Sequence, residues 1–146
     1  MSDTATAPTS APARAHRLGL PVLALVGLAL LRVPGPLLED LGVIRSGDPI
    51  AWALAWAPVV VWVLVVVLRK AARPFLTVLT TGLISGALLV LAYQLFWEQL
   101  FGDFTSADLT IRLIAIPGGL VNGALFGAIG GLVAAGIRVI VTRRDR

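Results

Sequence analysis

The sequence contains no cysteine and only one histidine, His16. The missing thiols exclude disulfides, thiolate nucleophiles, and metal or Fe–S sites with cysteine ligands. His16 lies beside Arg17 in an N-terminal stretch that we expect to be disordered, so we predict no haem ligation there. A Walker-type loop and a GxGxxG motif between a strand and a helix are also lacking. We therefore predict a protein without a cofactor, a metal site or a bound nucleotide.

Charged residues are scarce as well. They make up 14% of the 146 residues, while 58% are hydrophobic and the mean hydropathy is +0.92. An ordinary soluble domain is about 45–50% apolar, and roughly 20 apolar residues are needed for a helix to cross a bilayer. Four runs contain no Asp, Glu, Lys, Arg or His: residues 18–31, 50–68, 74–97 and 113–137. The sequence therefore predicts a multi-pass membrane protein surrounded by the lipid bilayer.

We predict an all-α fold, a bundle of four transmembrane helices with short interfacial helices in the outer connections. The predicted transmembrane domain covers residues 17–141, with helices at about 18–32, 50–68, 75–96 and 117–141. Residues 1–16 are small, polar and proline-containing, which predicts a disordered tail. Residues 142–146 form a predicted basic tail.

Two local patterns mark helix starts. Asp48 before Pro49 combines an N-cap carboxylate with proline in the first turn. The stretch Thr105-Ser106-Ala107-Asp108 resembles a capping box, in which a hydroxyl and a carboxylate three residues apart satisfy free N–H groups.

The first apolar run is shorter than the others. With Arg14 and Arg17 before it, the run resembles a signal peptide, but it ends at Arg32 without a small-x-small cleavage site, so we favour an uncleaved anchor. Fourteen residues span about 21 Å of a roughly 30 Å core, so Arg17 and Arg32 are expected to reach towards the interface. Alternatively, the crossing continues past Arg32 into residues 33–38. We favour a loop there, because Pro34-Gly35-Pro36 cannot continue a regular helix.

The basic residues predict the orientation. The two tails and the connection after residue 68 hold nine of the twelve Lys and Arg residues, whereas the other connections hold six of the eight acids. By the positive-inside rule, both termini are expected in the cytoplasm, at the inner membrane of a bacterium. The net charge of +4 and the pI near 11.1 then come from basic residues that set the orientation in the membrane. We therefore predict no nucleic-acid binding.

The uncharged runs also limit the chemistry. Proton relays, ion-coupled transporters and voltage sensors place ionisable groups inside the membrane, and the four runs offer none. Ser85, the serine well inside a predicted helix, has no histidine or lysine at membrane depth to activate it. Carboxylates in the outer connections are interpreted as solvated loop residues and helix caps. We predict that the protein is not an enzyme.

The most regular pattern is a line of glycines in the last run. Gly119, Gly123, Gly127 and Gly131 are four residues apart, so they share one helix face and form a groove almost free of side chains. A second face of small residues lies in the third run: Thr81, Gly82, Ser85 and Gly86. We favour packing of these two faces within one chain. The alternative is a glycine zipper between sister subunits around a pore.

Three further features leave a role in solute binding open. Asn122 is the strongly polar side chain of the last run, and a helix-to-helix hydrogen bond is its favoured role over a ligand contact. The sequence Ile116-Pro117-Gly118-Gly119 predicts a helix break, interpreted as a bend at the outer interface rather than a transporter site. Tyr93 and Gln94, with Trp97 and Glu98, suggest a polar patch or an aromatic belt at the outer mouth.

The functional prediction is a small non-enzymatic integral membrane protein that acts through helix-helix packing, alone or as an accessory subunit of a larger membrane complex. One alternative is a homo-oligomeric pore or channel of holin-like size built on the glycine line. Another is a small uncoupled solute transporter. The expected partners are the bilayer and either further copies of this chain or another membrane protein.

Overall fold

The computed structural model describes residues 20–102 and 108–144, and these ranges contain helices but no strand. The helices are α1 (Val22–Leu30), α2 (Pro34–Asp40), α3 (Pro49–Leu68), α4 (Pro74–Leu95), α5 (Trp97–Phe101) and α6 (Asp108–Arg144). Four segments are long and apolar enough to cross a membrane: Val22–Asp40, Pro49–Leu68, Pro74–Leu95 and Leu109–Arg143. The all-helical, four-span fold expected from the sequence is therefore confirmed. The predicted tail at 1–16 and most of the capping-box motif at 105–108 lie outside the described residues.

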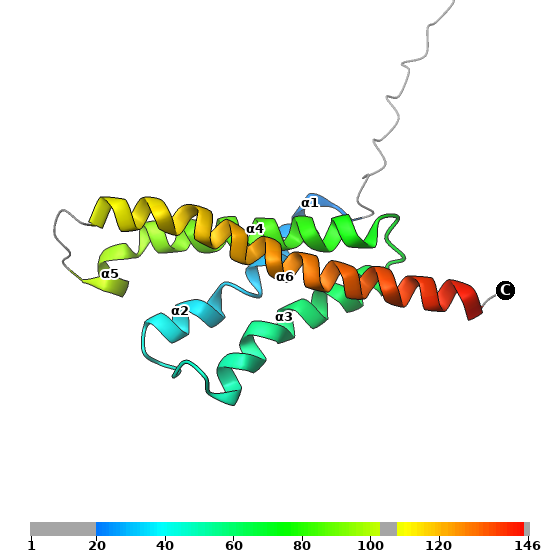
Figure 1. Cartoon of the computed structure of the whole chain (residues 1–146), viewed down its shortest axis with the longest axis horizontal. Helices are drawn as coiled ribbons and strands as arrows, with labels where there is room; N and C mark the ends of the chain where they lie inside the picture. Colours follow the sequence, from blue (N-terminus) through cyan, green and yellow to red (C-terminus); the bar gives the residue numbers. More distant parts are fainter. Residues whose placement is uncertain (1–19, 103–107, 145–146) are drawn as a thin grey trace, which may run out of the picture.

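α4 and α6 run side by side in opposite directions and form the long axis of the molecule (Figure 1). α3 leans against this pair, and α1 packs on α4. The start of α1, the turn between α3 and α4, and the end of α6 lie at one end of the bundle (Figure 1). The other end carries the connection from α2 to α3, and α5. We refer to these as the basic end and the acidic end, after the charged residues near them in the sequence.

Prolines start three of the helices. Pro34, Pro49 and Pro74 each stand in the first turn, where the missing N–H group costs no hydrogen bond. Asp48 precedes α3 at the N-cap position, but its side chain makes no capping hydrogen bond. The prolines therefore define the helix starts through their backbone geometry alone.

The apolar core lies in the half of the bundle nearer the basic end. Trp62 is fully buried there, and its indole Nε1 donates a hydrogen bond to the carbonyl oxygen of Leu28 at 2.7 Å. This bond ties α3 to α1 and satisfies a carbonyl in the last turn of α1. The other buried apolar residues of this cluster are Leu20, Leu25, Val59, Val63, Val66, Ala71, Val78 and Ala134.

The structure corrects the expectation for the first crossing. α1 ends at Leu30, three turn residues follow, and Pro34 begins α2, so the apolar span runs on to Asp40 as two helical pieces. The favoured loop over residues 33–38 was wrong, because Pro34 starts a new helix instead of interrupting an old one. α2 packs against α3 at Gly35, where an added Cβ would make an ordinary van der Waals contact of 3.4 Å with the Cβ of Leu54.

The last helix also differs from the prediction. α6 is one helix of 37 residues that passes through Pro117, whereas the sequence predicted a break at that proline and a helix from 117 to 141. At about 1.5 Å per residue this helix is roughly 55 Å long, well beyond the roughly 30 Å hydrocarbon core. It therefore extends past the core, and the predicted basic tail at 142–146 begins inside it.

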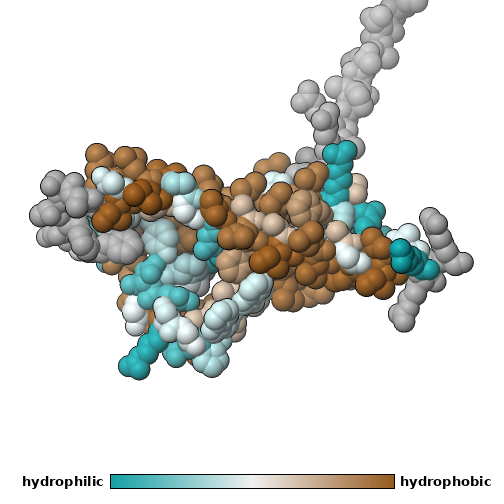
Figure 2. Space-filling view, in the orientation of Figure 1, coloured by the Kyte–Doolittle hydropathy of each residue, from teal (hydrophilic) through white to brown (hydrophobic). Residues whose placement is uncertain are grey.

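Hydrophobic residues cover most of the surface over α4 and α6, while hydrophilic residues gather over α2, the following connection and the start of α3 (Figure 2). Exposed leucine, valine and isoleucine side chains are numerous along α6, among them Leu125 at 56% and Leu132 at 65% exposure. Such a surface suits contact with lipid acyl chains.

Candidate functional site

The buried side of the bundle contains one arginine inside an apolar span. Arg32 lies in the turn between α1 and α2 and is only 3% exposed. The sequence placed this residue at the end of a helix, reaching towards water. The helix end was predicted to within two residues, because α1 ends at Leu30. The reach towards water was wrong, because the side chain is buried. The apolar segment Val22–Asp40 therefore contains a buried ionisable group, which marks a candidate functional site.

Two residues of α6 hold the guanidinium group of Arg32. Its Nη2 donates a hydrogen bond to Oδ1 of Asn122 at 2.6 Å. Its Cζ lies 3.9 Å from the ring centroid of Phe126, a cation–π contact. Phe126 in turn packs against Trp56 of α3, with the ring centroids 5.1 Å apart. The arginine thus links the first span to the last and leans on an aromatic pair.

Part of the guanidinium group has no protein partner. The Nε and Nη1 atoms of Arg32 are buried and make no hydrogen bond with the described residues, and no described carboxylate forms an ion pair with the group. A buried cation is normally paired or fully hydrogen-bonded, because the loss of hydration costs several kcal/mol. The site therefore has two unused donors and an uncompensated positive charge.

Polar contacts continue from Arg32 towards the acidic end. The hydroxyl of Tyr93 in α4 donates to Oδ2 of Asp40, the last residue of α2. This hydrogen bond ties α4 to the end of α2.

A second polar contact joins α4 to α6 near the same end. Nε2 of Gln94 donates to the carbonyl oxygen of Arg112 at 3.1 Å. The guanidinium group of Arg112 returns two bonds, from Nε to Oε1 of Gln94 at 3.3 Å and from Nη2 to its carbonyl oxygen at 3.1 Å. Arg112 also lies over the ring of Trp97, 5.3 Å from the centroid. Tyr93 and Gln94, singled out from the sequence, thus connect to α2 and α6 respectively.

All four glycines of the line in α6 lie against α4. A Cβ atom at Gly123 would come 2.4 Å from the carbonyl oxygen of Gly82 and 2.7 Å from Cα of Gly86. Gly127 lies against Leu79 and Gly82 with slightly more room, because the nearest atoms are 3.0 and 3.1 Å from its ideal Cβ position. Gly119 meets the side chain of Val90, and Gly131 meets both the ring and the carbonyl oxygen of Phe75. Backbone therefore meets backbone at the centre of the α4–α6 contact.

The small polar residues of α4 are buried as well. Thr81 is 0% exposed, and its hydroxyl donates to the carbonyl oxygen of Thr77 at 2.9 Å. Ser85 is 1% exposed, and its Oγ has no hydrogen-bond partner among the described residues. α4 approaches α6 most closely at Gly82 and Gly86. These glycines directly follow Thr81 and Ser85 in the sequence.

Sequence reasoning found Asn122 as a polar contact but missed its partner. The available signal was that Arg32 has apolar residues on both sides, Leu30-Leu31 before it and Leu37-Leu38 after it.

Within the described ranges no group of three or more His, Cys, Asp or Glu residues could hold a metal ion. Comparison with protein-family models, with curated protein sequences and with solved structures gives no match.

Proposed function

We propose that this chain is a non-enzymatic integral membrane protein that acts through contacts between membrane-embedded helices, alone or as an accessory subunit of a larger membrane complex. The observation that supports it is the glycine line of α6, every member of which lies against α4 of the same chain. That face is then occupied within the bundle. Sister subunits would have to meet through other faces, which speaks against a pore built on a glycine zipper.

The proposed orientation places both termini in the cytoplasm, at a bacterial inner membrane. It is supported by the basic residues near one end of the bundle, which include Arg69, Lys70, Arg73 and Arg138. The positive-inside rule assigns such an end to the cytoplasmic side.

The mass of the protein in mild detergent tests the proposal. We expect the purified chain to behave as a monomer of 15.3 kDa, corrected for bound detergent. In this arrangement Gly123→Leu lowers the melting temperature of the monomer, because the leucine meets the backbone of α4. A homo-oligomer that Gly123→Leu separates into stable helical monomers would contradict the proposal and support the pore.

A second candidate is uncoupled movement of a small anionic solute, and Arg32 is the observation that favours it. The group is a buried cation within an apolar segment, and its Nε and Nη1 atoms make no hydrogen bond with the described residues. Its partner Asn122 was predicted to form a helix-to-helix hydrogen bond, with a solute contact as the alternative.

Anion flux into liposomes tests this second function. We expect saturable uptake of a small monovalent anion that falls about tenfold or more in Arg32→Gln, since a hydrogen bond to a charged group contributes about 1.5–3 kcal/mol. Arg112→Gln is the matched control, because it removes a guanidinium group outside this site and should keep wild-type rates. Flux no faster than in empty liposomes would exclude transport. An unchanged rate in folded Arg32→Gln would exclude the site.

A further inference from the structure

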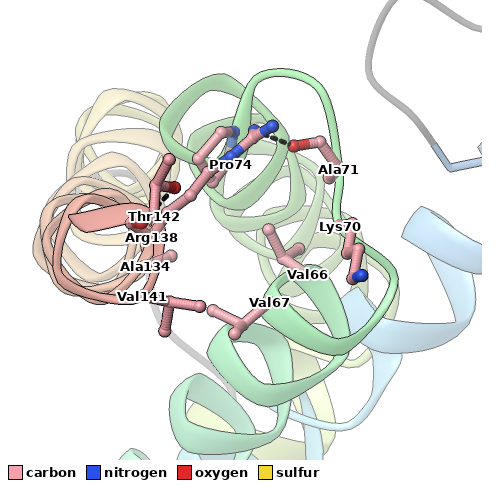
Figure 3. A pocket seen from close by; sticks show the side chains of 9 residues that line it. All are labelled: Val66, Val67, Lys70, Ala71, Pro74, Ala134, Arg138, Val141 and Thr142. Atoms are coloured by element: carbon pink, nitrogen blue, oxygen red, sulfur yellow. Dashed lines mark hydrogen bonds between the residues drawn. The ribbon is translucent and has the colours of Figure 1, made fainter. Parts of the chain in front are cut away.

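A groove opens at the basic end of the bundle, away from Arg32. It has a volume of about 250 Å³ and lies between the last turn of α3, the turn that follows, and the last turns of α6 (Figure 3). Its apolar walls include Val66 and Val67 of α3, and Ala134 and Val141 of α6. Lys70, Arg138 and Thr142 bring polar groups to the same groove.

A second hollow shares part of this lining. It has a volume of about 490 Å³ and is bordered by Pro74, Arg138 and Thr142, which also line the groove, together with Val139 and Arg143. Arg138 therefore borders two neighbouring, largely apolar depressions. A molecule with one anionic group and two hydrocarbon chains matches this arrangement.

Arg138 is held in place by the turn between α3 and α4. Its Nη1 donates to the carbonyl oxygens of Ala71 and Ala72, the second at 3.0 Å (Figure 3 shows the bond to Ala71). The guanidinium group is thereby fixed beside the groove. The side chain is exposed, so an anion can reach it.

Lys70 adds an independent observation. Its φ of +50° is in the left-handed region, and the bonds from its N–H to Val67 O (3.0 Å) and from Ala71 N–H to Val66 O (3.1 Å) close α3 in a Schellman motif. Glycine is the usual residue at this position. Here the position carries a lysine, which borders the groove.

The charges near this end are of one sign among the described residues. Arg69, Arg73 and Arg143 flank the groove, whereas the described acids belong to α2, the connection after it, α5 and the start of α6, at the other end. Asp145 lies outside the described residues. A basic groove between helices near the end of an apolar bundle is complementary to an anionic lipid headgroup.

We propose that this groove binds an anionic phospholipid. The phosphate lies beside Lys70 and Arg138, and an acyl chain follows the apolar wall formed by Val67 and Val141. The backbone of the turn holds Arg138 in place beside the phosphate, and Lys70 adds positive charge at the edge of the groove. The inference does not depend on either function proposed above.

Native mass spectrometry of the full-length chain with dioleoyl phosphatidylglycerol and with dioleoyl phosphatidylcholine tests it. The two lipids have the same acyl chains, so the difference reports the headgroup. We expect the anionic lipid to bind about tenfold more tightly. In Lys70→Gly this affinity falls about fivefold, and the fold is kept because glycine suits the positive φ. Arg45→Gln, an exposed arginine at the acidic end, is the matched control and leaves affinity unchanged.

A second pair of variants separates the groove from general surface charge. Val141→Trp fills the groove without changing charge and should weaken binding, whereas Ile140→Trp, an exposed neighbour that does not line it, should not. Equal affinity for the two lipids would overturn the proposal. The proposal would also be overturned if Lys70→Gly bound the anionic lipid as tightly as Arg45→Gln. The same holds if Val141→Trp bound it as tightly as Ile140→Trp. Displacement of the lipid by millimolar inorganic phosphate would assign the site to a soluble anion instead.

Discussion

Gly123→Ala is expected to disrupt the α4–α6 pair, although it adds a single methyl group. That methyl would lie 2.4 Å from the carbonyl oxygen of Gly82 and 2.7 Å from Cα of Gly86. A clashing side chain can rotate away, but here the neighbours are backbone atoms, so the two helices must move apart. Overpacking of a well-packed interior costs about 1–3 kcal/mol and sometimes more. We expect a loss in the free energy of unfolding at the upper end of that range, about 3 kcal/mol.

Thermal unfolding followed by circular dichroism in one detergent checks this prediction. Two glycines of the same helix serve as controls, because an added Cβ at Gly118 or Gly136 meets no atom within 4 Å. Alanine there should leave the melting temperature unchanged or raise it, since alanine has the higher helix propensity. If Gly123→Ala melts like Gly136→Ala, the close contact between α4 and α6 is wrong.

Asn122→Leu is expected to lower the free energy of unfolding at least as much as Gly123→Ala. The cause is electrostatic rather than steric. Asn122 supplies the one hydrogen bond that the structure gives to the Arg32 guanidinium group, at 2.6 Å. Without it the buried guanidinium group has no hydrogen bond with the described residues and keeps its contact with Phe126. A buried donor left without its partner costs about 1–3 kcal/mol, and more when the group is charged. We expect a loss of about 3 kcal/mol in the free energy of unfolding, measured by unfolding in detergent.

A double-mutant cycle gives this prediction its control. Arg32→Met removes the charge together with its desolvation cost, so it should destabilise the bundle much less than Asn122→Leu. Combining both changes should recover most of the lost stability, because the leucine then faces methionine and not a guanidinium group. Additive effects would mean that the two residues do not interact. The same Arg32→Met protein, still folded, then allows the flux assay to test the charge alone.

The apolar runs were sufficient to predict four spans, and prolines located two of the helix starts closely. The ranges predicted for the second and third helices begin one residue after Pro49 and Pro74 and end within one residue of Leu68 and Leu95. Hydrophobic length and the tolerance for proline in a first turn are local properties. They can be read from a single sequence.

Arg32 and Pro117 show where local reasoning fails. Arg32 does follow the end of α1, but its side chain is buried and does not reach towards water as predicted. The actual partner, Asn122, is 90 residues away and comes into contact only after folding. Pro117 removes one backbone hydrogen bond, and α6 continues through it for 27 further residues to Arg144. In both cases tertiary packing outweighs a local preference.

The glycine line was predictable as a close-contact face because spacing alone defines a helix face. Its orientation against α4 needed a second pattern, the pair Gly82 and Gly86, which the sequence also offers. By contrast, the groove beside Lys70 could not be anticipated. It depends on the left-handed backbone at that residue and on the bonds from Arg138 to the turn.

The bond between Arg32 and Asn122 has a consequence for biosynthesis. Arg32 leaves the ribosome 90 residues before Asn122, which belongs to α6. An arginine near the centre of a helix opposes insertion by roughly 2.5–3.5 kcal/mol on the translocon scale. The segment Val22–Asp40 therefore gains the hydrogen-bond partner of its buried charge only when α6 is in place. A protein truncated before Asn122 would lack the side chain that accepts this bond.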